Sequence, residues 1–245
     1  MKQKDRLRKA ETPLIITCEH GGNQVPARYR HLFSHCRSLL KSHRGFDPGA
    51  LVMARALARH FSAPLLTSTV SRLVVDLNRS IGHRDLHMEA IRALPTDLRQ
   101  EIVEHYYRPY RKEVERLVAE SIALRGRAIH FSCHSFTERL DGSVRHADVS
   151  LLYDPARKNE KVLCAKWKSA LTASAPDIEV RRNYPYQGRN DGLTSALRKK
   201  FSADTYLGIE LELNQRHLLC PSRQWFALRQ LVIATLNTAL VDCHA

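Results

Sequence analysis

The segment "PLIITCEHGG", Pro13 to Gly22, decides the fold class, because it joins a buried strand to a polar turn. Its apolar run from Leu14 to Cys18 is typical of a strand buried in a parallel sheet. The run ends abruptly at Glu19, His20 and two glycines, which permit a tight turn and the close approach of a ligand. In open α/β sheets the ligand crevice lies at the carboxyl ends of the strands. We therefore expect Glu19 and His20 to lie at a functional site.

Strand and helix patterns alternate along the rest of the chain. Short apolar, β-branched segments predict six strands, over residues 13–17, 63–70, 127–133, 148–154, 177–183 and 206–213. Amphipathic segments predict helices over residues 48–61, 97–126 with a kink at Pro109, 159–173, 191–201 and 222–241. This alternation favours an α/β fold with a mostly parallel sheet. No internal boundary is visible, so residues 1–245 are expected to form one domain, with residues 1–11 flexible.

Composition restricts the class of protein and of partner. The 245 residues contain no apolar run that could span a bilayer and no secretory signal, so a cytoplasmic protein without membrane association is expected. The six cysteines lack any C-x-x-C spacing, which argues against a thiolate zinc finger. The formal net charge of +14 favours an acidic small molecule over nucleic acid, because no aromatic-basic binding motif accompanies it. The oligomeric state does not follow from the sequence.

Two histidines and a carboxylate in this pattern indicate a metal site. A catalytic zinc ion needs three protein ligands and an open position for water. His20 and His134 each stand at the carboxyl end of a predicted buried strand. A single such histidine is more often a structural hydrogen-bonding group, but the repetition favours a shared ion. Asp47, in "FDPGA", and Glu19 are the candidates for the carboxylate ligand. The expected cofactor is Zn²⁺ or another divalent transition metal.

A second carboxylate must then transfer the proton, because the metal ligands are occupied. Side chains alternate along a strand, so Glu210 and Glu212 in "IELELNQ" point to the same face. We expect Glu212, or else Glu210, to be this base. A serine hydrolase is disfavoured, since no serine stands in a G-x-S-x-G setting.

The sequence resembles the N-formylglutamate amidohydrolase family in six blocks that follow the family order. The blocks are "CEHGGNQVP" (18–26), "FDPGA" (46–50), "SRLVVDLNRS" (71–80), "CHSF" (133–136), "RRNYPYQG" (181–188) and "IELELNQ" (209–215). The resemblance implies a phosphorylase/hydrolase-like fold, similar to that of the zinc-dependent exopeptidases: a three-layer α/β/α sandwich with a mixed, mostly parallel central sheet. It also implies hydrolysis of an N-formyl or other N-acyl amide on an acidic amino acid. With N-formyl-L-glutamate the products would be formate and glutamate, a late step of histidine degradation in bacteria.

A more distant resemblance, to acyl-amino-acid hydrolases of the carboxypeptidase type, implies individual metal ligands. Those enzymes carry H-x-x-E, and "HGGN" matches His20 to the first ligand. Asn23 stands where the glutamate ligand would be, and a neutral amide is a poor substitute for a carboxylate on zinc. The resemblance therefore implies that Asp47 replaces it, with Glu19 as the alternative.

The same resemblance implies how the substrate is bound. Asn78 and Arg79 in "LNRS" match the pair that binds the α-carboxylate, and a guanidinium suits that group because it donates two parallel hydrogen bonds. Arg72 would contact the side-chain carboxylate or the amide carbonyl. Tyr186, in a loop over the site, and Asn23 complete the expected substrate-binding residues.

These expectations combine into an amidohydrolase in which a zinc-activated water attacks the acyl carbonyl and Glu212 transfers the proton. The partner is a small acidic N-acyl amino acid. Two alternatives remain: a hydrolase of the same fold that acts on another N-acyl amino acid or a short peptide, and a non-catalytic basic binding protein.

Overall fold

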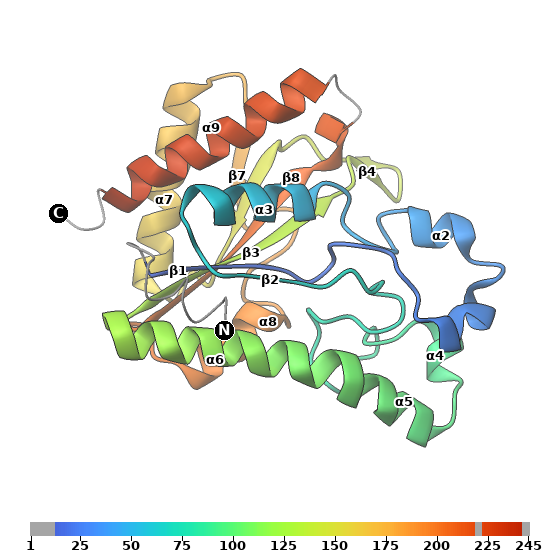
Figure 1. Cartoon of the computed structure of the whole chain (residues 1–245). Helices are drawn as coiled ribbons and strands as arrows, with labels where there is room; N and C mark the ends of the chain where they lie inside the picture. Colours follow the sequence, from blue (N-terminus) through green and yellow to red (C-terminus); the bar gives the residue numbers. More distant parts are fainter. Residues whose placement is uncertain (1–12, 219–221, 242–245) are drawn as a thin grey trace.

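A six-stranded sheet forms the centre of the computed structural model, which describes residues 13–218 and 222–241 (Figure 1). Across the sheet the strand order is β2-β1-β3-β8-β6-β7, and all neighbours are parallel except β6 and β8. The strands are β1 (Leu14–Cys18), β2 (Leu65–Thr67), β3 (Ala128–Phe136), β6 (Val149–Leu152), β7 (Val180–Arg182) and β8 (Tyr206–Asn214). The predicted mixed, mostly parallel sheet is confirmed. The segment 1–11, expected to be flexible, lies outside the described residues.

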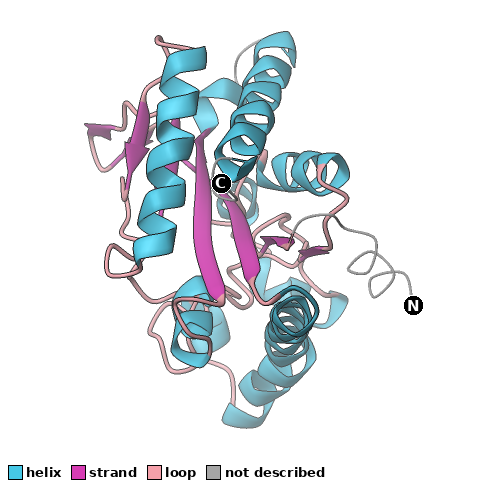
Figure 2. Ribbon diagram, turned by 90° about the vertical axis from the view of Figure 1, so that its left-hand side faces the viewer, coloured by secondary structure: helices cyan, strands magenta, loops and turns pink. Residues whose placement is uncertain are grey.

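Helices cover both faces of this sheet, as Figures 1 and 2 show. One face packs against α3, α7 and α9, and the other packs against α5, α6 and α8. Their bounds are α3 (Ala50–His60), α5 (Thr96–Ile102), α6 (Arg108–Arg125), α7 (Lys158–Ser174), α8 (Leu193–Lys200) and α9 (Ser222–Val241). The predicted three-layer α/β/α sandwich is therefore confirmed.

The two faces of the sheet differ in polarity, and this difference positions the site. The face toward α3, α7 and α9 is apolar along its whole length and includes Ile16, Phe131 and Leu211. The opposite face is apolar where the strands begin and polar toward their carboxyl ends, where Ser132 pairs in register with Glu210. Because β1, β3 and β8 run parallel, their polar ends meet at one edge of the sheet.

The long helical segment predicted over residues 97–126 is interrupted before Pro109. A π-helical turn, η2 (Val103–Tyr107), joins α5 to α6. Proline cannot donate a backbone hydrogen bond and its ring crowds the preceding turn, which accounts for the irregularity at this position. The helix ends as predicted at Gly126, whose φ is 73°.

Several short elements lie outside the predicted pattern, because each is too short to produce a hydrophobic period. They are η1 (Ala27–Phe33), α2 (Arg37–Lys41), α4 (Glu89–Arg92), η3 (Gln215–Leu218) and a small hairpin of β4 (Arg139–Leu140) and β5 (Ser143–Val144). Within the described ranges no helix has both the length and the apolar composition that a membrane span requires.

Candidate functional site

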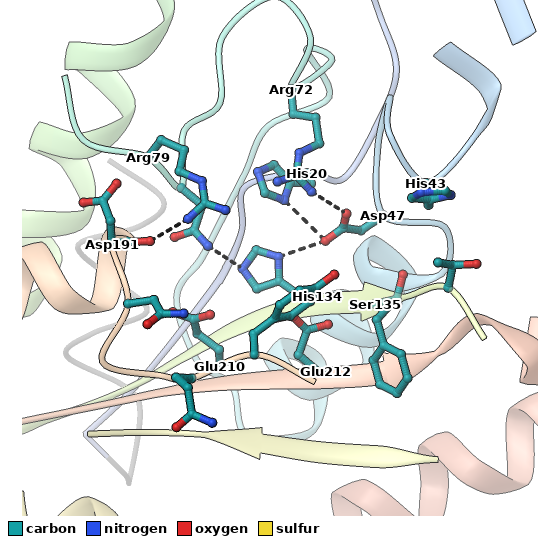
Figure 3. Close-up of a pocket in the computed structure, with 16 residues that line it drawn as sticks. His20, His43, Asp47, Arg72, Arg79, His134, Ser135, Asp191, Glu210 and Glu212 are labelled. Atoms are coloured by element: carbon teal, nitrogen blue, oxygen red, sulfur yellow. Dashed lines mark hydrogen bonds and ion pairs between the residues drawn. The ribbon is translucent and has the colours of Figure 1, made fainter. Parts of the chain in front are cut away.

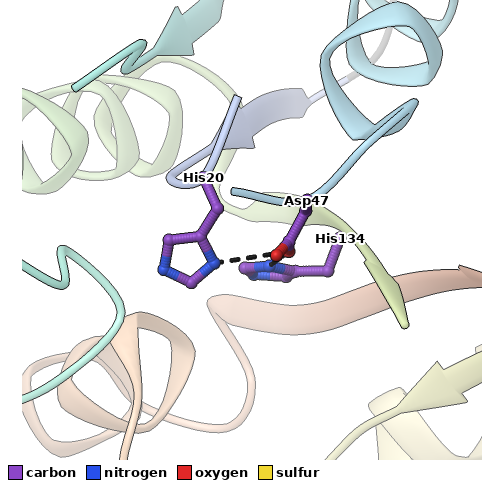
Figure 4. A group of neighbouring side chains, drawn as sticks. All are labelled: His20, Asp47 and His134. Carbon is purple, nitrogen blue, oxygen red and sulfur yellow. Dashed lines mark hydrogen bonds and ion pairs between the residues drawn. The ribbon is translucent and has the colours of Figure 1, made fainter. Parts of the chain in front are cut away.

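Two imidazoles and a carboxylate converge at the carboxyl edge of the sheet (Figures 3 and 4). His20 follows β1, His134 lies near the end of β3, and Asp47 precedes α3. One ligand atom from each residue lies within 4.8 Å of the others. Asp47 Oδ2 lies 3.3 Å from His20 Nδ1 and 2.9 Å from His134 Nδ1. All three side chains are buried, so protein groups and not solvent surround the cluster.

The turn after β1 places His20 beside Asp47. The backbone amide of Asp47 donates to the carbonyl of His20 at 2.9 Å. A Cβ atom on Gly21 would lie 2.9 Å from the carbonyl oxygen of Ser68, and one on Gly22 would lie 2.8 Å from that of Thr69. At these two glycines the chain therefore passes close to its own backbone. The prediction that the glycines make room for a ligand is not supported.

Each imidazole has a second carboxylate on its other nitrogen. His20 Nε2 lies 2.7 Å from Asp76 Oδ1, and His134 Nε2 lies 3.2 Å from Glu19 Oε2. Hydrogen bonds of this kind orient metal-ligating histidines and select which ring nitrogen is free to bind the ion. Both histidines thus direct Nδ1 toward Asp47 and Nε2 toward an orienting carboxylate.

Glu19 lies behind His134 and not in the cluster. Its oxygens accept hydrogen bonds from the hydroxyl groups of Ser132 and Tyr110. Burial opposes its ionisation, but the contacts with His134 outweigh burial and lower the pKa of Glu19 below its ordinary value. Of the two candidate carboxylates, the structure therefore brings Asp47 to the imidazoles, and it gives Glu19 an orienting position.

Arg72 lies between two of these acids. Its guanidinium donates to Asp76 at 2.8 Å and to Asp47 at 3.3 Å. Although burial acts against ionisation, this charge and the imidazoles lower the pKa of Asp47 below its ordinary value. Asp47 is therefore an ionised acceptor. Arg72, which was expected to contact substrate, already has two carboxylate partners.

Glu210 and Glu212 line the same cavity but differ in their contacts. Glu210 Oε1 accepts a hydrogen bond of 2.7 Å from Thr194 Oγ1. Glu212 Oε2 is buried and has no hydrogen-bond partner among the described residues. Burial raises the pKa of Glu212 to about 8, because the charged form is poorly solvated there. The alternation predicted for this strand is confirmed, since Leu211 lies in the core on the opposite face.

The "LNRS" segment is tied to the start of α8. Asn78 Oδ1 accepts from the amide of Leu193 at 2.7 Å, and Arg79 donates to the carbonyl of Asp191 at 2.8 Å. Both side chains line the cavity, and the Nε atom of Arg79 has no partner among the residues described. Asn78 Nδ2 also reaches to 3.5 Å from His134 Nε2, so the segment contacts the metal-site candidate directly.

Asn23 is the expected substrate-binding residue that the structure does not bring to the cavity. Its side-chain amide donates to the carbonyl of Leu40 at 3.1 Å, so it anchors the segment that ends α2. Tyr186, by contrast, lines the cavity as expected.

Two residues of the site, His43 and Asp76, were not among the metal-binding, catalytic or substrate-binding residues expected from the sequence. His43 lies in a polar segment, yet it is partly buried and lines the cavity. Asp76 directly follows the apolar run of "LVVD", and a carboxylate in such a position needs a buried partner. That was the available signal for Asp76, whereas nothing local marked His43.

The cavity itself has a volume of about 170 Å³, and all three residues of the His–Asp–His cluster line it. Its wall joins segments from across the chain: His20, His43, Asp47, Arg72, Asn78, Arg79, His134, Ser135, Phe136, Thr137, Tyr186, Gln187, Asn190, Asp191, Glu210 and Glu212. Basic, acidic and amide groups dominate this lining, which suits a small, charged, hydrogen-bonding ligand.

Comparison with known proteins gives a consistent result. A model of the N-formylglutamate amidohydrolase family matches residues 12–219. The fold is similar to that of a gene product of Agrobacterium tumefaciens, with a TM-score of 0.83 and 26% identity over 98% of this chain and 94% of that chain. It is also similar in fold to N-formylglutamate amidohydrolase from Ralstonia eutropha, with a TM-score of 0.70 and 19% identity over 94% and 93% of the two chains. No curated protein matches the chain.

Proposed function

Because the chain belongs to the N-formylglutamate amidohydrolase family, whose activity is hydrolysis of an amide C–N bond, we propose that it removes an N-formyl or other N-acyl group from an acidic amino acid such as N-formyl-L-glutamate. The reaction would be metal-dependent, and Glu212 would act as general base. The family assignment agrees with the six sequence blocks that first indicated it. The particular acyl group, the metal ion and the residue roles are the parts that we propose.

The donor set at the cluster fits a zinc ion or another divalent transition metal. His20, Asp47 and His134 would be the ligands, since two imidazole nitrogens and a carboxylate oxygen are typical of catalytic zinc sites. The orienting contacts from Asp76 and Glu19 support this assignment, because they hold each imidazole with Nδ1 toward the cluster. When bound, the ion would polarise the acyl carbonyl and lower the pKa of a water molecule.

The observation that carries the proposal is the Oε2 atom of Glu212, which has no hydrogen-bond partner among the described residues. A buried carboxylate oxygen without a hydrogen bond is costly, and such a cost is accepted where the group needs a free lone pair for function. In its ionised form, which the charge of a bound cation would favour against the effect of burial, Glu212 would accept the proton of the attacking water and deliver it to the leaving amine. Glu210 is less suited to this role, because one of its oxygens is already bonded to Thr194.

Substrate orientation would depend on the "LNRS" segment. Arg79 presents a guanidinium whose Nε atom has no partner within the described part of the chain, and Asn78 lies beside it at the cavity wall. We assign the α-carboxylate of the substrate to this pair, since a guanidinium binds a carboxylate through two parallel charge-assisted hydrogen bonds. Arg72 and Tyr186, which also line the cavity, would then face the rest of the substrate.

The test is a measurement of metal content followed by hydrolysis assays. Purified protein should contain about one transition-metal ion per chain, and it should release formate and glutamate from N-formyl-L-glutamate. A chelator should abolish turnover, and added Zn²⁺ should restore it. Activity that is undiminished in metal-free protein would contradict the metal dependence. Activity on N-acetyl or N-succinyl amino acids alone would support amide hydrolysis at this site, but it would contradict the proposal that an N-formyl amino acid is the substrate.

A further inference from the structure

The cavity extends to both sides of the His–Asp–His cluster. Figure 3 shows Arg79 and Asp191 on one side of the imidazoles and His43 and Ser135 on the other. A substrate that places its α-carboxylate at Arg79 and its amide at the cluster would still leave the second side of the cavity to be filled. The residues on the second side therefore determine which other chemical groups of a substrate can be bound.

Arg145 does not itself line the cavity, but it contacts Tyr186, which does. Arg145 Nη1 donates to the hydroxyl oxygen of Tyr186 at 3.1 Å, and its guanidinium carbon lies 5.2 Å from the centre of the tyrosine ring. Tyr186 lines the cavity. Burial, and after it the positive charge of Arg145, lower the pKa of His43, which shows that this charge acts on a group of the cavity wall.

Arg145 differs from Arg72, which lines the cavity, in having no acidic partner among the described residues. Arg72 is neutralised by two carboxylates, at 2.8 and 3.3 Å. In residues 13–218 and 222–241 no carboxylate forms an ion pair with Arg145, and the guanidinium is partly exposed. A cation of this kind remains available for an anion that enters the cavity.

The contact is held in place from both ends. The backbone of Arg145 donates to the carbonyl of Glu138 at 2.7 Å and accepts from Asn214 Nδ2 at 2.9 Å. The loop that carries Tyr186 is fixed by Asn183, whose Oδ1 accepts from the amides of Tyr153 and Gly188. Little ordering of the backbone is therefore needed before an anion binds.

We propose that Arg145 and Tyr186 together bind a second carboxylate of the substrate, distinct from the α-carboxylate. The inference rests on the proposed amidohydrolase function and names the residues that would make it selective for acidic substrates. The phenol oxygen accepts a hydrogen bond from Arg145, so its own hydrogen is free to donate. The remaining N–H groups of the guanidinium lie beside it, and the two side chains offer convergent donors to one carboxylate.

The second carboxylate has two possible sources, the amino-acid side chain or a dicarboxylic acyl group. Matched pairs of substrates distinguish them. N-formylglutamate against N-formylglutamine tests the side chain, and N-succinylalanine against N-butyrylalanine tests the acyl group. For wild-type protein loaded with Zn²⁺, kcat/KM should favour the acidic member in one of these pairs.

Arg145→Gln should lower that preference on the order of tenfold, the effect of losing one charge-assisted contact at a partly exposed site. Turnover of the neutral member should change little. Tyr186→Phe should lower the same preference less, since the ring and the guanidinium remain, and it tests the proposal independently should Arg145→Gln fold poorly.

Arg181→Gln is the matched control. The guanidinium carbon of Arg181 lies 4.6 Å from the ring centre of Tyr184 in the same segment, but Tyr184, unlike Tyr186, does not line the cavity, and Arg181 is paired with Glu179. An unchanged preference in Arg145→Gln for both substrate pairs, or an equal loss in Arg181→Gln, would overturn the proposal.

Measurements of ligand binding test this inference separately from the proposed function. Titration calorimetry of N-formylglutamate and N-formylglutamine, and of the succinyl and butyryl pair, can be carried out on the Glu212→Gln variant without turnover. Preferential binding of an acidic ligand that disappears on adding Arg145→Gln supports the carboxylate site even if the protein hydrolyses none of these amides. Equal binding of acidic and neutral ligands contradicts it even if the hydrolase activity is found.

Discussion

The Nε2 atom of His20 lies 2.7 Å from Oδ1 of Asp76, while its Nδ1 atom faces Asp47. The imidazole is thus held between two carboxylates that come from segments 29 residues apart in the chain (76 − 47). Burial and the positive charge of Arg72 lower the pKa of His20, but the two acids outweigh them and raise it. The contact with Asp76 therefore holds the His20 imidazole with its Nδ1 atom toward Asp47.

Asp76→Asn should weaken metal binding by about 10- to 100-fold, the usual effect of losing a carboxylate that orients a ligating histidine. The loss can be measured by competition for Zn²⁺ with a chromophoric chelator. Asp85→Asn is the control, because Asp85 belongs to the same segment and its side chain is 59% exposed. An affinity in Asp76→Asn equal to that of the control would show that Asp76 does not orient His20.

His134→Ala should lose bound metal, whereas Glu212→Gln should keep the metal and lose turnover by about 10²- to 10⁴-fold, the range typical of a missing general base. Glu210→Gln should lose much less, because an amide oxygen can still accept the hydrogen bond of Thr194. Metal analysis and steady-state kinetics on the three variants check this. Undiminished turnover in Glu212→Gln would remove the proposed base.

Arg198→Leu should destabilise the fold by about 3–5 kcal/mol, since it leaves Glu160 as an unpaired buried charge. Arg198 donates to Glu160 at 3.0 Å and to the carbonyls of Gly188 and Gly208, and so ties the loop of Tyr186 to β8. The free energy of unfolding in urea provides the measurement. Lys199→Leu, at an exposed neighbouring position, should change it by far less. Equal effects would argue against a structural role for the ion pair.

His130 should make the fold less stable in acid. It is fully buried between Thr17 and Tyr206, at 2.8 Å from each hydroxyl, and burial lowers its pKa to about 4. In the unfolded chain a histidine has a pKa of about 6.5. The unfolded state therefore binds the proton first as the pH falls, so stability is full above pH 6.5 and is lost between about 6.5 and 4.

The corresponding measurement compares wild type with His130→Gln at pH 7.5 and pH 5.0, both stripped of metal. Between these values the wild-type free energy of unfolding should fall by about 2 kcal/mol more than that of the variant. If the free energy of unfolding fell equally in the two proteins between these pH values, the lowered pKa of His130 would be contradicted.

The sequence by itself determined the layers of this protein and the edge at which its site lies. Local apolar patterns marked the six strands and the long helices, because the side chains of a strand or helix face the core at regular intervals along the chain. Alternation along β8 placed Glu210 and Glu212 on one face for the same reason, and the apolar runs that end in His20 and His134 placed both histidines at the carboxyl edge.

The tertiary structure decided between groups that the sequence could not separate. Asp47 joins the imidazoles while Glu19 lies behind His134. Among the residues that the structure describes, the Oε2 atom of Glu212 has no hydrogen-bond partner, whereas Glu210 is bonded to Thr194. These differences depend on how loops cross above the sheet. A contact between segments far apart in the chain is set by strand register and loop path, and neither leaves a periodic trace in the sequence. The contact of Arg145 with Tyr186, across 41 residues, is of the same kind.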